Sequence, residues 1–430
     1  MAIGASASPG GRSHDVTRTR EKTRTSTAPS NRPSAEHSVE QRRFEGFPVG
    51  YYDDLHPDPS LNFEMNRFST GEADMVEEMR SVGPRIHDLR EYTREFLALG
   101  EAALERGEKL KGAYYLRSAE FFMFTDDPRR QPTRRQYIQL MREDFGLEAE
   151  DHCWVPYEGG ALSAYRWTPP PRPRGTVVVF GGFDSYIEEW FPMQRYFADA
   201  GYDVVLFEGP GQGSTVEDHH LPFTHEWHKP VGAVLDHFNL NDVTLLGISM
   251  GGCLAIRAAA HEPRVHRVVT DDICSDYLEV TLGGLKPSAR AELSSLLKLG
   301  ANHIIDTVVD RAMKESPFAE WAVHNGMLVF GSDTPSGYLG QLHLYRTDDV
   351  SPLVEQDVLL LGGAEDFCIP LHQFHDQIRT LTRARSVTAR LFTRKEQAQQ
   401  HVQVGNLGLQ FRVIKDWIEI MQDQQQVDLP

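Results

Sequence analysis

Cysteine is scarce in this chain, which holds four in 430 residues. Cys153, Cys253, Cys274 and Cys368 show no paired spacing, which argues against a disulfide-stapled fold and favours reduced thiols in a cytoplasmic compartment. The 44 basic residues are outnumbered by 62 acidic ones, and the net charge of −18 disfavours nucleic acid or an anionic membrane as a partner. Residues 1–40 also lack an apolar run that would serve as a signal peptide or a membrane span.

The most informative segment is an apolar strand that runs directly into Gly247-Ile248-Ser249-Met250-Gly251, followed by an alanine-rich helix. Side chains two positions before and after such a serine would collide with the neighbouring strand and helix, so glycine is needed there. The turn exposes the Ser249 hydroxyl beside the positive end of a helix. The pattern predicts a nucleophile elbow, whereas the pentapeptide without these flanks would indicate only a glycine-rich turn.

A nucleophile elbow predicts an acid and then a histidine, each just after a later strand. An apolar strand from Val358 ends at Asp366, and His401 follows a further strand at 386–392. The three groups would therefore meet at the carboxyl ends of parallel strands. Glu365 is the competing acid. Asp366 is preferred because side-chain direction flips with one residue of register, and the Phe-Cys-Ile-Pro turn after it is typical of a triad acid.

An earlier buried strand ends in Gly181-Gly182-Phe183. Acyl transfer needs two backbone N–H groups that converge on the developing negative charge. The expected donors of this oxyanion hole are the amides of Phe183 and Met250. Candidate substrate contacts follow in the same loop: Tyr186, Glu188 and Trp190.

The length and the periodicity predict more than one structural unit. Residues 1–43 are rich in Ser, Thr, Arg, Pro and Gly and are expected to form a disordered tail. Helical periodicity follows at 44–148 and predicts a cap. Strands with alternating helices occupy 149–280 and 351–430, the expected catalytic domain, and the intervening 281–350 predicts a helical lid.

Two further signals point to ligands only weakly. The glycines of 209–213 follow a strand, but their spacing does not fit a dinucleotide fingerprint. His219, His220, His225 and His228 are close in sequence, yet no carboxylate or thiolate spacing completes a known metal site. The sequence therefore predicts neither a cofactor nor a metal.

Taken in order, these elements resemble a known family. The likeness runs from Phe44 to the final helix and rests on the helical N-terminal unit, Gly181 to Ser185 with Glu188-Glu189, the loop Glu208 to Gly213, the elbow, and His401 with Gly405-Asn406. The chain resembles the capped α/β-hydrolases of the group that contains 2,6-dihydroxypseudooxynicotine hydrolase and the fungal Ayg1-type pigment hydrolases. The fermentation-respiration-switch-type esterases are more distant relatives.

The resemblance implies a mostly parallel sheet flanked by helices, and hydrolysis of a carbon-carbon bond beside a ketone in phenolic or polyketide-like substrates. It also implies a further acidic residue in the pocket, as in the pyridine-diol enzyme. Asp272, Asp276 and Glu279 lie at about the right distance after the elbow, and the sequence does not choose among them.

Three functions remain open at this stage. The leading hypothesis is a serine hydrolase of secondary metabolism, such as pigment biosynthesis, that acts through an acyl-enzyme. An esterase, thioesterase, acyltransferase or cyclase would use the same triad, and a non-catalytic ligand-binding protein is the third alternative. The expected partner is a small aromatic or polyketide-like molecule, and the sequence also allows a homodimer.

Overall fold

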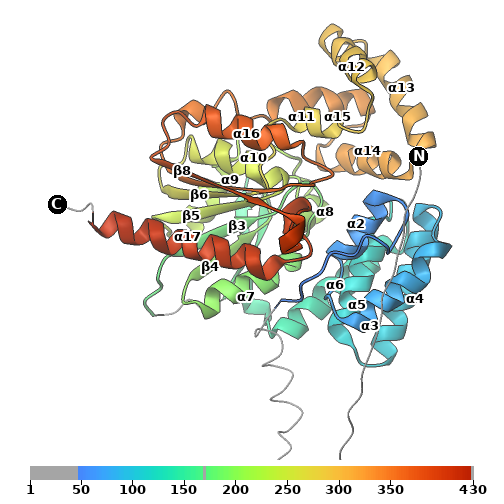
Figure 1. The fold of residues 1–430 in the computed structure, drawn as a ribbon, viewed down its shortest axis with the longest axis horizontal. Helices are drawn as coiled ribbons and strands as arrows, with labels where there is room; N and C mark the ends of the chain where they lie inside the picture. The colour runs from blue at the N-terminus through green and yellow to red at the C-terminus, as the bar shows by residue number, and fades with distance from the viewer. Residues whose placement is uncertain (1–46, 168–170, 428–430) are drawn as a thin grey trace, which may run out of the picture. The chain divides into compact units, whose positions relative to one another are not determined.

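An eight-stranded sheet forms the centre of the structure, in the order β1-β2-β4-β3-β5-β6-β7-β8 (Figure 1). The computed structural model describes residues 47–167 and 171–427, so the predicted disordered tail lies outside the described residues. From β4 to β8 neighbouring strands are parallel, whereas β1 and β2 form an antiparallel hairpin at one edge. The strands are β1 (His152–Tyr157), β2 (Gly160–Arg166), β3 (Thr176–Phe180), β4 (Asp203–Phe207), β5 (Val243–Ile248), β6 (Val265–Asp271), β7 (Asp357–Gly363) and β8 (Ser386–Phe392).

The central strands are buried along their whole length because both faces of the sheet are covered. Every residue of β4, β5 and β7 is buried. Such continuous burial is typical of parallel strands between two helical layers. Figure 1 shows α7 and α17 on one face and α9, α10 and α16 on the other. The helices around the sheet are α7 (Phe191–Asp199), α8 (Gly213–His219), α9 (His228–His237), α10 (Met250–Ala259), α16 (Leu371–Thr380) and α17 (Leu407–Val427).

Within residues 47–151, five α-helices precede the sheet, and we call them the cap. They are α2 (Pro59–Arg67), α3 (Ala73–Val82), α4 (Leu89–Glu105), α5 (Lys109–Phe121) and α6 (Arg130–Phe145). The Asp88 carboxylate accepts the Glu91 N–H and so begins α4, and Gly107 takes a left-handed φ of 79° at the turn into α5. The cap has a hydrophobic core of its own, which includes Met65, Tyr92 and Phe96.

A second helical group, which we call the lid, lies between β6 and β7 in sequence. It comprises α11 (Tyr277–Thr281), α12 (Pro287–Leu299), α13 (Asn302–Glu315), α14 (Pro317–Val329) and α15 (Pro335–Gln341). Trp321 of α14 belongs to the core of the cap, stacks on Phe121 of α5 at 4.4 Å between ring centroids, and donates its indole N–H to the Phe121 carbonyl at 2.7 Å. The cap and the lid therefore contact each other directly.

Short 3-10 helices join several of these elements. They are η1 (Gly83–Arg85), η2 (Ala149–Asp151), η3 (Ile187–Trp190), η4 (Leu342–Leu344), η5 (Ser351–Leu353), η6 (Arg394–Glu396) and η7 (His401–Gln403).

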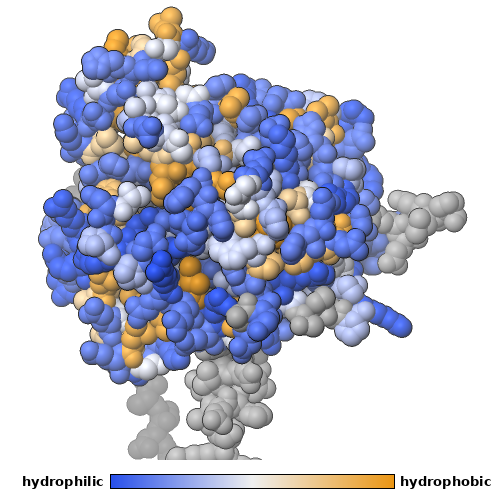
Figure 2. Space-filling view, turned by 180° about the vertical axis from the view of Figure 1, so that it is seen from behind, coloured by the Kyte–Doolittle hydropathy of each residue, from blue (hydrophilic) through white to orange (hydrophobic). Residues whose placement is uncertain are grey.

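The surface seen from behind is mostly hydrophilic, with hydrophobic side chains scattered over it and gathered at the lid (Figure 2). Leu299, Ile304 and Val308 of the lid region are among the exposed large hydrophobic residues. No helix in the described part of the chain is long and apolar enough to cross a membrane.

Candidate active site

Ser249 lies at the sharp turn between β5 and α10. Its backbone has φ 60° and ψ −124°, a left-handed φ that non-glycine residues rarely adopt. A Cβ on Gly247 would lie 2.0 Å from the Gly251 carbonyl oxygen, and a Cβ on Gly251 would lie 2.6 Å from the Gly181 oxygen. Both glycines are therefore required by close backbone approach, and the turn leaves the Ser249 hydroxyl half-buried rather than enclosed in the core.

The structure brings Ser249, His401 and Asp366 together at the carboxyl ends of β5, β8 and β7. His401 Nδ1 lies 2.7 Å from Asp366 Oδ2, and His401 Nε2 lies 2.8 Å from Ser249 Oγ. Because a carboxylate only accepts hydrogen bonds, Nδ1 carries the proton and the neutral imidazole presents Nε2 as an acceptor. The Ser249 hydroxyl can then donate to Nε2, which is the arrangement needed to remove its proton.

The turn after β7 fixes the Asp366 side chain. Its Oδ1 accepts the N–H groups of Cys368 and Ile369 at 2.7 and 2.9 Å, which leaves Oδ2 for the imidazole. Glu365, the competing acid, is exposed and forms an ion pair with Arg394. The two adjacent carboxylates therefore serve different partners.

Burial and charge act in opposite directions on the histidine. Burial lowers the pKa of His401, but the Asp366 carboxylate and its hydrogen bond, together with Asp272 and Asp184, raise it to about 9. Burial raises the pKa of Asp366, and the charge and hydrogen bond of His401 outweigh it, so that this pKa lies below its ordinary value. Both shifts favour an imidazolium-carboxylate pair, the state that forms once serine has given up its proton.

Of the three additional acidic residues, Asp272 is the one that lies beside the histidine. Its Oδ2 is 3.5 Å from His401 Nδ1. Asp276 instead caps α11 by accepting the Glu279 N–H at 3.0 Å, and Glu279 contacts His372 and Gln373 of α16. Burial, followed by the charge of Asp366, raises the pKa of Asp272 well above its ordinary value.

Asp272 also holds the loop that carries the histidine. Its two carboxylate oxygens accept the Val402 N–H at 2.7 Å and the Gln403 side-chain amide at 2.8 Å. Val402 and Gln403 have left-handed φ values of 52° and 49°, a conformation that costs free energy in non-glycine residues and needs such external support.

The Gly181-Gly182-Phe183 segment lies against the elbow. A Cβ on Gly182 would be 2.9 Å from the Ser249 Cβ and 3.0 Å from the Met250 nitrogen. Only glycine fits so close to the nucleophile. The backbone of this segment and the first turn of α10 are therefore side by side, where the amides of Phe183 and Met250 were predicted to converge.

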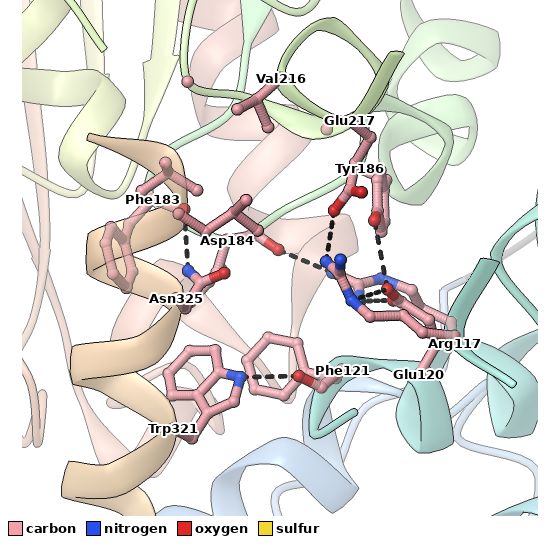
Figure 3. Close-up of a pocket in the computed structure, with 15 residues that line it drawn as sticks. Arg117, Glu120, Phe121, Phe183, Asp184, Tyr186, Val216, Glu217, Trp321 and Asn325 are labelled. Carbon is pink, nitrogen blue, oxygen red and sulfur yellow. Dashed lines mark hydrogen bonds and ion pairs between the residues drawn. The ribbon is translucent and has the colours of Figure 1, made fainter. Parts of the chain in front are cut away.

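Side chains of the cap and the lid contact the carbonyls that follow in this segment (Figure 3). Arg117 of α5 donates to the Asp184 carbonyl at 2.7 Å, and Asn325 of α14 donates to the Phe183 carbonyl at 3.5 Å. Arg117 is 2% exposed and is paired with Glu120 and Glu189. These contacts span 67 and 142 residues of sequence, and no local pattern would have revealed them.

A cavity of about 30 Å³ lies between this segment, the cap and the lid, and Tyr186 is one of its lining residues (Figure 3). The Tyr186 hydroxyl donates to Glu120, and its ring lies 4.5 Å from the Arg117 guanidinium. The lining of this cavity does not include Ser249, Glu188 or Trp190. The cavity is small and lies beside the Phe183-Asp184 segment rather than at Ser249.

The other two predicted substrate contacts lie elsewhere. Glu188 is buried, accepts the Tyr165 hydroxyl at 2.8 Å and lines a separate cleft beneath α6. Trp190 is partly buried and packs against the main hydrophobic core. The histidines at 219–228 do not converge either: His219 packs on Trp154, and His228 faces His261.

Aromatic side chains of the cap and the lid lie near the histidine and the segment after β3. Phe63 of α2 lies 6.1 Å from the His401 ring and 4.7 Å from Phe367, between ring centroids. Phe183 packs against Tyr277 of α11 and Trp321 of α14. The cap therefore supplies an aromatic ring beside His401, and both the cap and the lid contribute to the aromatic cluster that contains Trp321.

Comparison with known proteins agrees with this geometry. Residues 175–287 match the family described as alpha/beta hydrolase fold. The hydrolyase poxO of Penicillium oxalicum is 30% identical over 305 residues, which cover 62% of this chain and 71% of that protein. The chain belongs to the α/β-hydrolase family. Another relative of this α/β-hydrolase is the 20-hydroxy-prefusarin hydrolase of Gibberella moniliformis, 28% identical over 309 residues, which cover 65% of this chain and 73% of the relative.

A solved structure extends the likeness beyond the sheet. The crystal structure of 2,6-dihydroxy-pseudo-oxynicotine hydrolase matches 82% of this α/β-hydrolase and 93% of its own chain, with a TM-score of 0.56 and 23% identity. The match covers more of the chain than the sheet and its flanking helices, and it confirms the predicted fold class.

Proposed function

We propose that this α/β-hydrolase hydrolyses a carbon-carbon bond beside a ketone in a phenolic or polyketide-like substrate, in the manner of a retro-Claisen reaction. The observation that carries the proposal is the hydrogen-bonded chain from Asp366 through His401 to Ser249, with the Phe63 ring of the cap beside His401. The choice of substrate class is supported by the predicted resemblance and by the relative named a 20-hydroxy-prefusarin hydrolase.

In the first half of the reaction, Ser249 Oγ attacks the ketone carbon while His401 Nε2 takes its proton. Asp366 keeps the imidazole in the correct tautomer and stabilises the imidazolium. The carbonyl oxygen becomes an oxyanion, which the Phe183 and Met250 amides receive. When the adjacent carbon-carbon bond breaks, the electron pair on the oxyanion forms the carbonyl π bond again.

The leaving group is bonded through carbon, and its departure determines which substrates can react. Its electron pair must be delocalised into an enolate or an electron-rich phenol ring, and the His401 imidazolium returns the proton to carbon. A water molecule, deprotonated by His401, then attacks the acyl-serine and releases a carboxylic acid. A site closed by aromatic helices keeps bulk water away until the leaving group has departed.

Mass spectrometry of the products tests this proposal. The enzyme would be incubated with phenolic aryl ketones, β-diketones and matched aryl esters, in parallel with Ser249→Ala. Serine-dependent shortening of a ketone, with the acid and the C–H fragment both detected, is the expected result. Cleavage of esters or thioesters alone would contradict carbon-carbon hydrolysis and favour the esterase or acyltransferase function, because the same triad serves any of these leaving groups.

A further inference from the structure

Gln212 is a buried side chain that joins two loops at the active site. It lies in the loop after β4 and is 2% exposed. Its Nε2 donates to the Gly181 carbonyl at 2.6 Å and to the Gly182 carbonyl at 3.1 Å. Its Oε1 accepts the Gly209 N–H at 2.9 Å. A buried amide with all these contacts holds the segment after β3 in one position relative to the loop after β4.

The orientation of the Gln212 amide is defined by its partners. Exchange of Oε1 and Nε2 would place an oxygen against two carbonyl oxygens and an NH₂ group against an N–H. The observed arrangement satisfies both ends of the amide, so Nε2 faces the segment beside the nucleophile.

These contacts set the direction of the predicted oxyanion donor. In a trans peptide the C=O and the following N–H point in opposite directions. The Gly182 carbonyl and the Phe183 N–H belong to the same peptide unit. Because Gln212 holds the Gly182 carbonyl on one side, the Phe183 N–H is directed to the opposite side. A Cβ on Gly182 would lie 2.9 Å from the Ser249 Cβ, so this peptide unit adjoins the nucleophile.

We propose that Gln212 is a positioning residue for the oxyanion hole: its side-chain amide aligns the Gly182-Phe183 peptide so that the Phe183 N–H receives the charge formed when Ser249 attacks. The role rests on the acyl transfer of the proposed function, but not on a carbon leaving group. It accounts for a buried glutamine in this glycine-rich loop, because the Gln212 side chain donates to the Gly181 and Gly182 carbonyls.

A positioning role predicts an effect on the transition state and little on ground-state binding. Gln212→Met keeps the volume and removes the two donated hydrogen bonds, and Gln212→Glu keeps the shape and the Gly209 contact. Gln194→Met is the matched control, because Gln194 is a fully buried glutamine of α7 whose Nε2 donates to the Val204 carbonyl at 3.4 Å. Thermal unfolding of all three variants shows which of them fold.

The measurements use 4-nitrophenyl acetate for kcat and KM, and 2,2,2-trifluoroacetophenone and acetophenone as inhibitors. We expect kcat to fall about 10- to 100-fold in Gln212→Met and Gln212→Glu, with KM changed by less than about twofold, since an oxyanion donor is displaced rather than removed. Affinity for the trifluoromethyl ketone, which forms a charged hemiketal with serine, should fall in parallel, whereas affinity for acetophenone should not.

The opposite results would overturn the proposal. An unchanged kcat in a folded Gln212 variant, an equal loss in Gln194→Met, or equal weakening of both ketones would each show a structural role alone. If Gln212→Met does not fold, Gln212→Glu carries the same test. A fluorophosphonate that fails to label Ser249 in the wild type would instead refute the proposed function and the Gln212 role with it. Cleavage of esters but not ketones would leave the Gln212 test intact.

Discussion

The two halves of the active site are held in different ways. Ser249, Asp366 and His401 follow β5, β7 and β8, and Asp272 supports the histidine loop from the end of β6. The segment after β3, which carries the predicted oxyanion donor, is contacted by Arg117 of the cap and Asn325 of the lid. In the proposed mechanism, proton transfer would therefore depend on groups that follow strands of the sheet. Stabilisation of the transition-state charge would depend on a segment that the cap and the lid contact.

The largest effect is expected for the residues that follow the strands of the sheet. Ser249→Ala removes the nucleophile and should lower kcat by about 10⁵-fold or more, because the remaining triad residues act only through serine. The variant should keep the unfolding temperature of the wild type, since a smaller side chain fits the elbow. Steady-state kinetics and thermal unfolding check both statements, and near-normal turnover in the variant would remove Ser249 from the mechanism.

A smaller loss should follow from changing the acid. Asp366→Asn is expected to lower kcat by about 10²- to 10⁴-fold, because the amide does not stabilise the imidazolium or fix its tautomer. Asp272, 3.5 Å from the same nitrogen, should retain part of the activity. The double variant with Asp272→Asn should therefore lose more than the two separate losses combined. Strict additivity in this double-mutant cycle would show that Asp272 does not replace Asp366.

The variant Arg117→Met tests the contribution of the cap to the segment after β3. We expect kcat to fall about tenfold, because the Asp184 carbonyl loses its donor and the segment after β3 becomes less ordered. The free energy of unfolding should also fall by about 3 to 5 kcal/mol, since Glu120 and Glu189 are left buried without this partner.

Kinetics well below the unfolding temperature separate these two effects. Arg264→Met, which removes an ion pair with the buried Glu262 just before β6, serves as the control and should leave kcat unchanged. If Arg117→Met lowers stability with no change in kcat, the cap does not contribute to charge stabilisation.

The pH dependence of kcat/KM examines the electrostatics of the histidine. The proposed mechanism requires neutral His401, whose pKa is raised to about 9 by Asp366, Asp272 and Asp184. The rate should therefore rise with pH through a range well above the ordinary histidine pKa of about 6.5. Asp272 is one of the groups that raise the pKa of His401, so Asp272→Asn should move this rise in rate to lower pH. A rise of kcat/KM near pH 6.5 that is the same in the wild type and in Asp272→Asn would contradict the assignment of this titration to His401.

The smallest effect concerns the contact between the cap and the lid. Trp321→Phe keeps an aromatic ring on Phe121 and removes the hydrogen bond to its carbonyl. The loss of about 1 kcal/mol should raise the population of open molecules up to about fivefold. Fluorophosphonate labelling of Ser249 should become faster by a similar factor. Trp154→Phe, on the exposed edge strand β1, is the control. Equal labelling rates in both variants would show that the Trp321 hydrogen bond does not hold the cap and the lid together.

The sequence predicts those parts of the molecule that are encoded locally. The elbow, the strands β3 to β8 and the lid helices each have a periodicity or a glycine pattern of their own. The Phe-Cys-Ile-Pro turn that follows Asp366 is the local signal that distinguishes it from Glu365. The hairpin of β1 and β2 was missed, although Glu158 and Gly159, with φ values of 41° and 83°, form the two-residue turn that was its available signal.

The remainder of the site depends on contacts between distant segments. Asp272 could not be chosen over Asp276 and Glu279, because the direction of each side chain is set by the local path of the chain after β6. Arg117, Asn325 and Gln212 donate hydrogen bonds to carbonyls that are distant in sequence. The sequence alone does not distinguish these residues from any other Arg, Asn or Gln. Glu188 and Trp190 belong to η3, which follows Tyr186 directly. Neither side chain lines the cavity that Tyr186 lines.

Intact-protein mass spectrometry of the enzyme during turnover tests the central claim most directly. A phenolic β-diketone would be mixed with the wild type, quenched in acid within the first turnovers, and mapped by peptide sequencing. The account predicts an adduct on Ser249 with the mass of the acyl fragment alone, and release of the other fragment with a new C–H bond. An adduct with the mass of the whole substrate, or none on Ser249 while product accumulates, would contradict carbon-carbon cleavage through an acyl-enzyme.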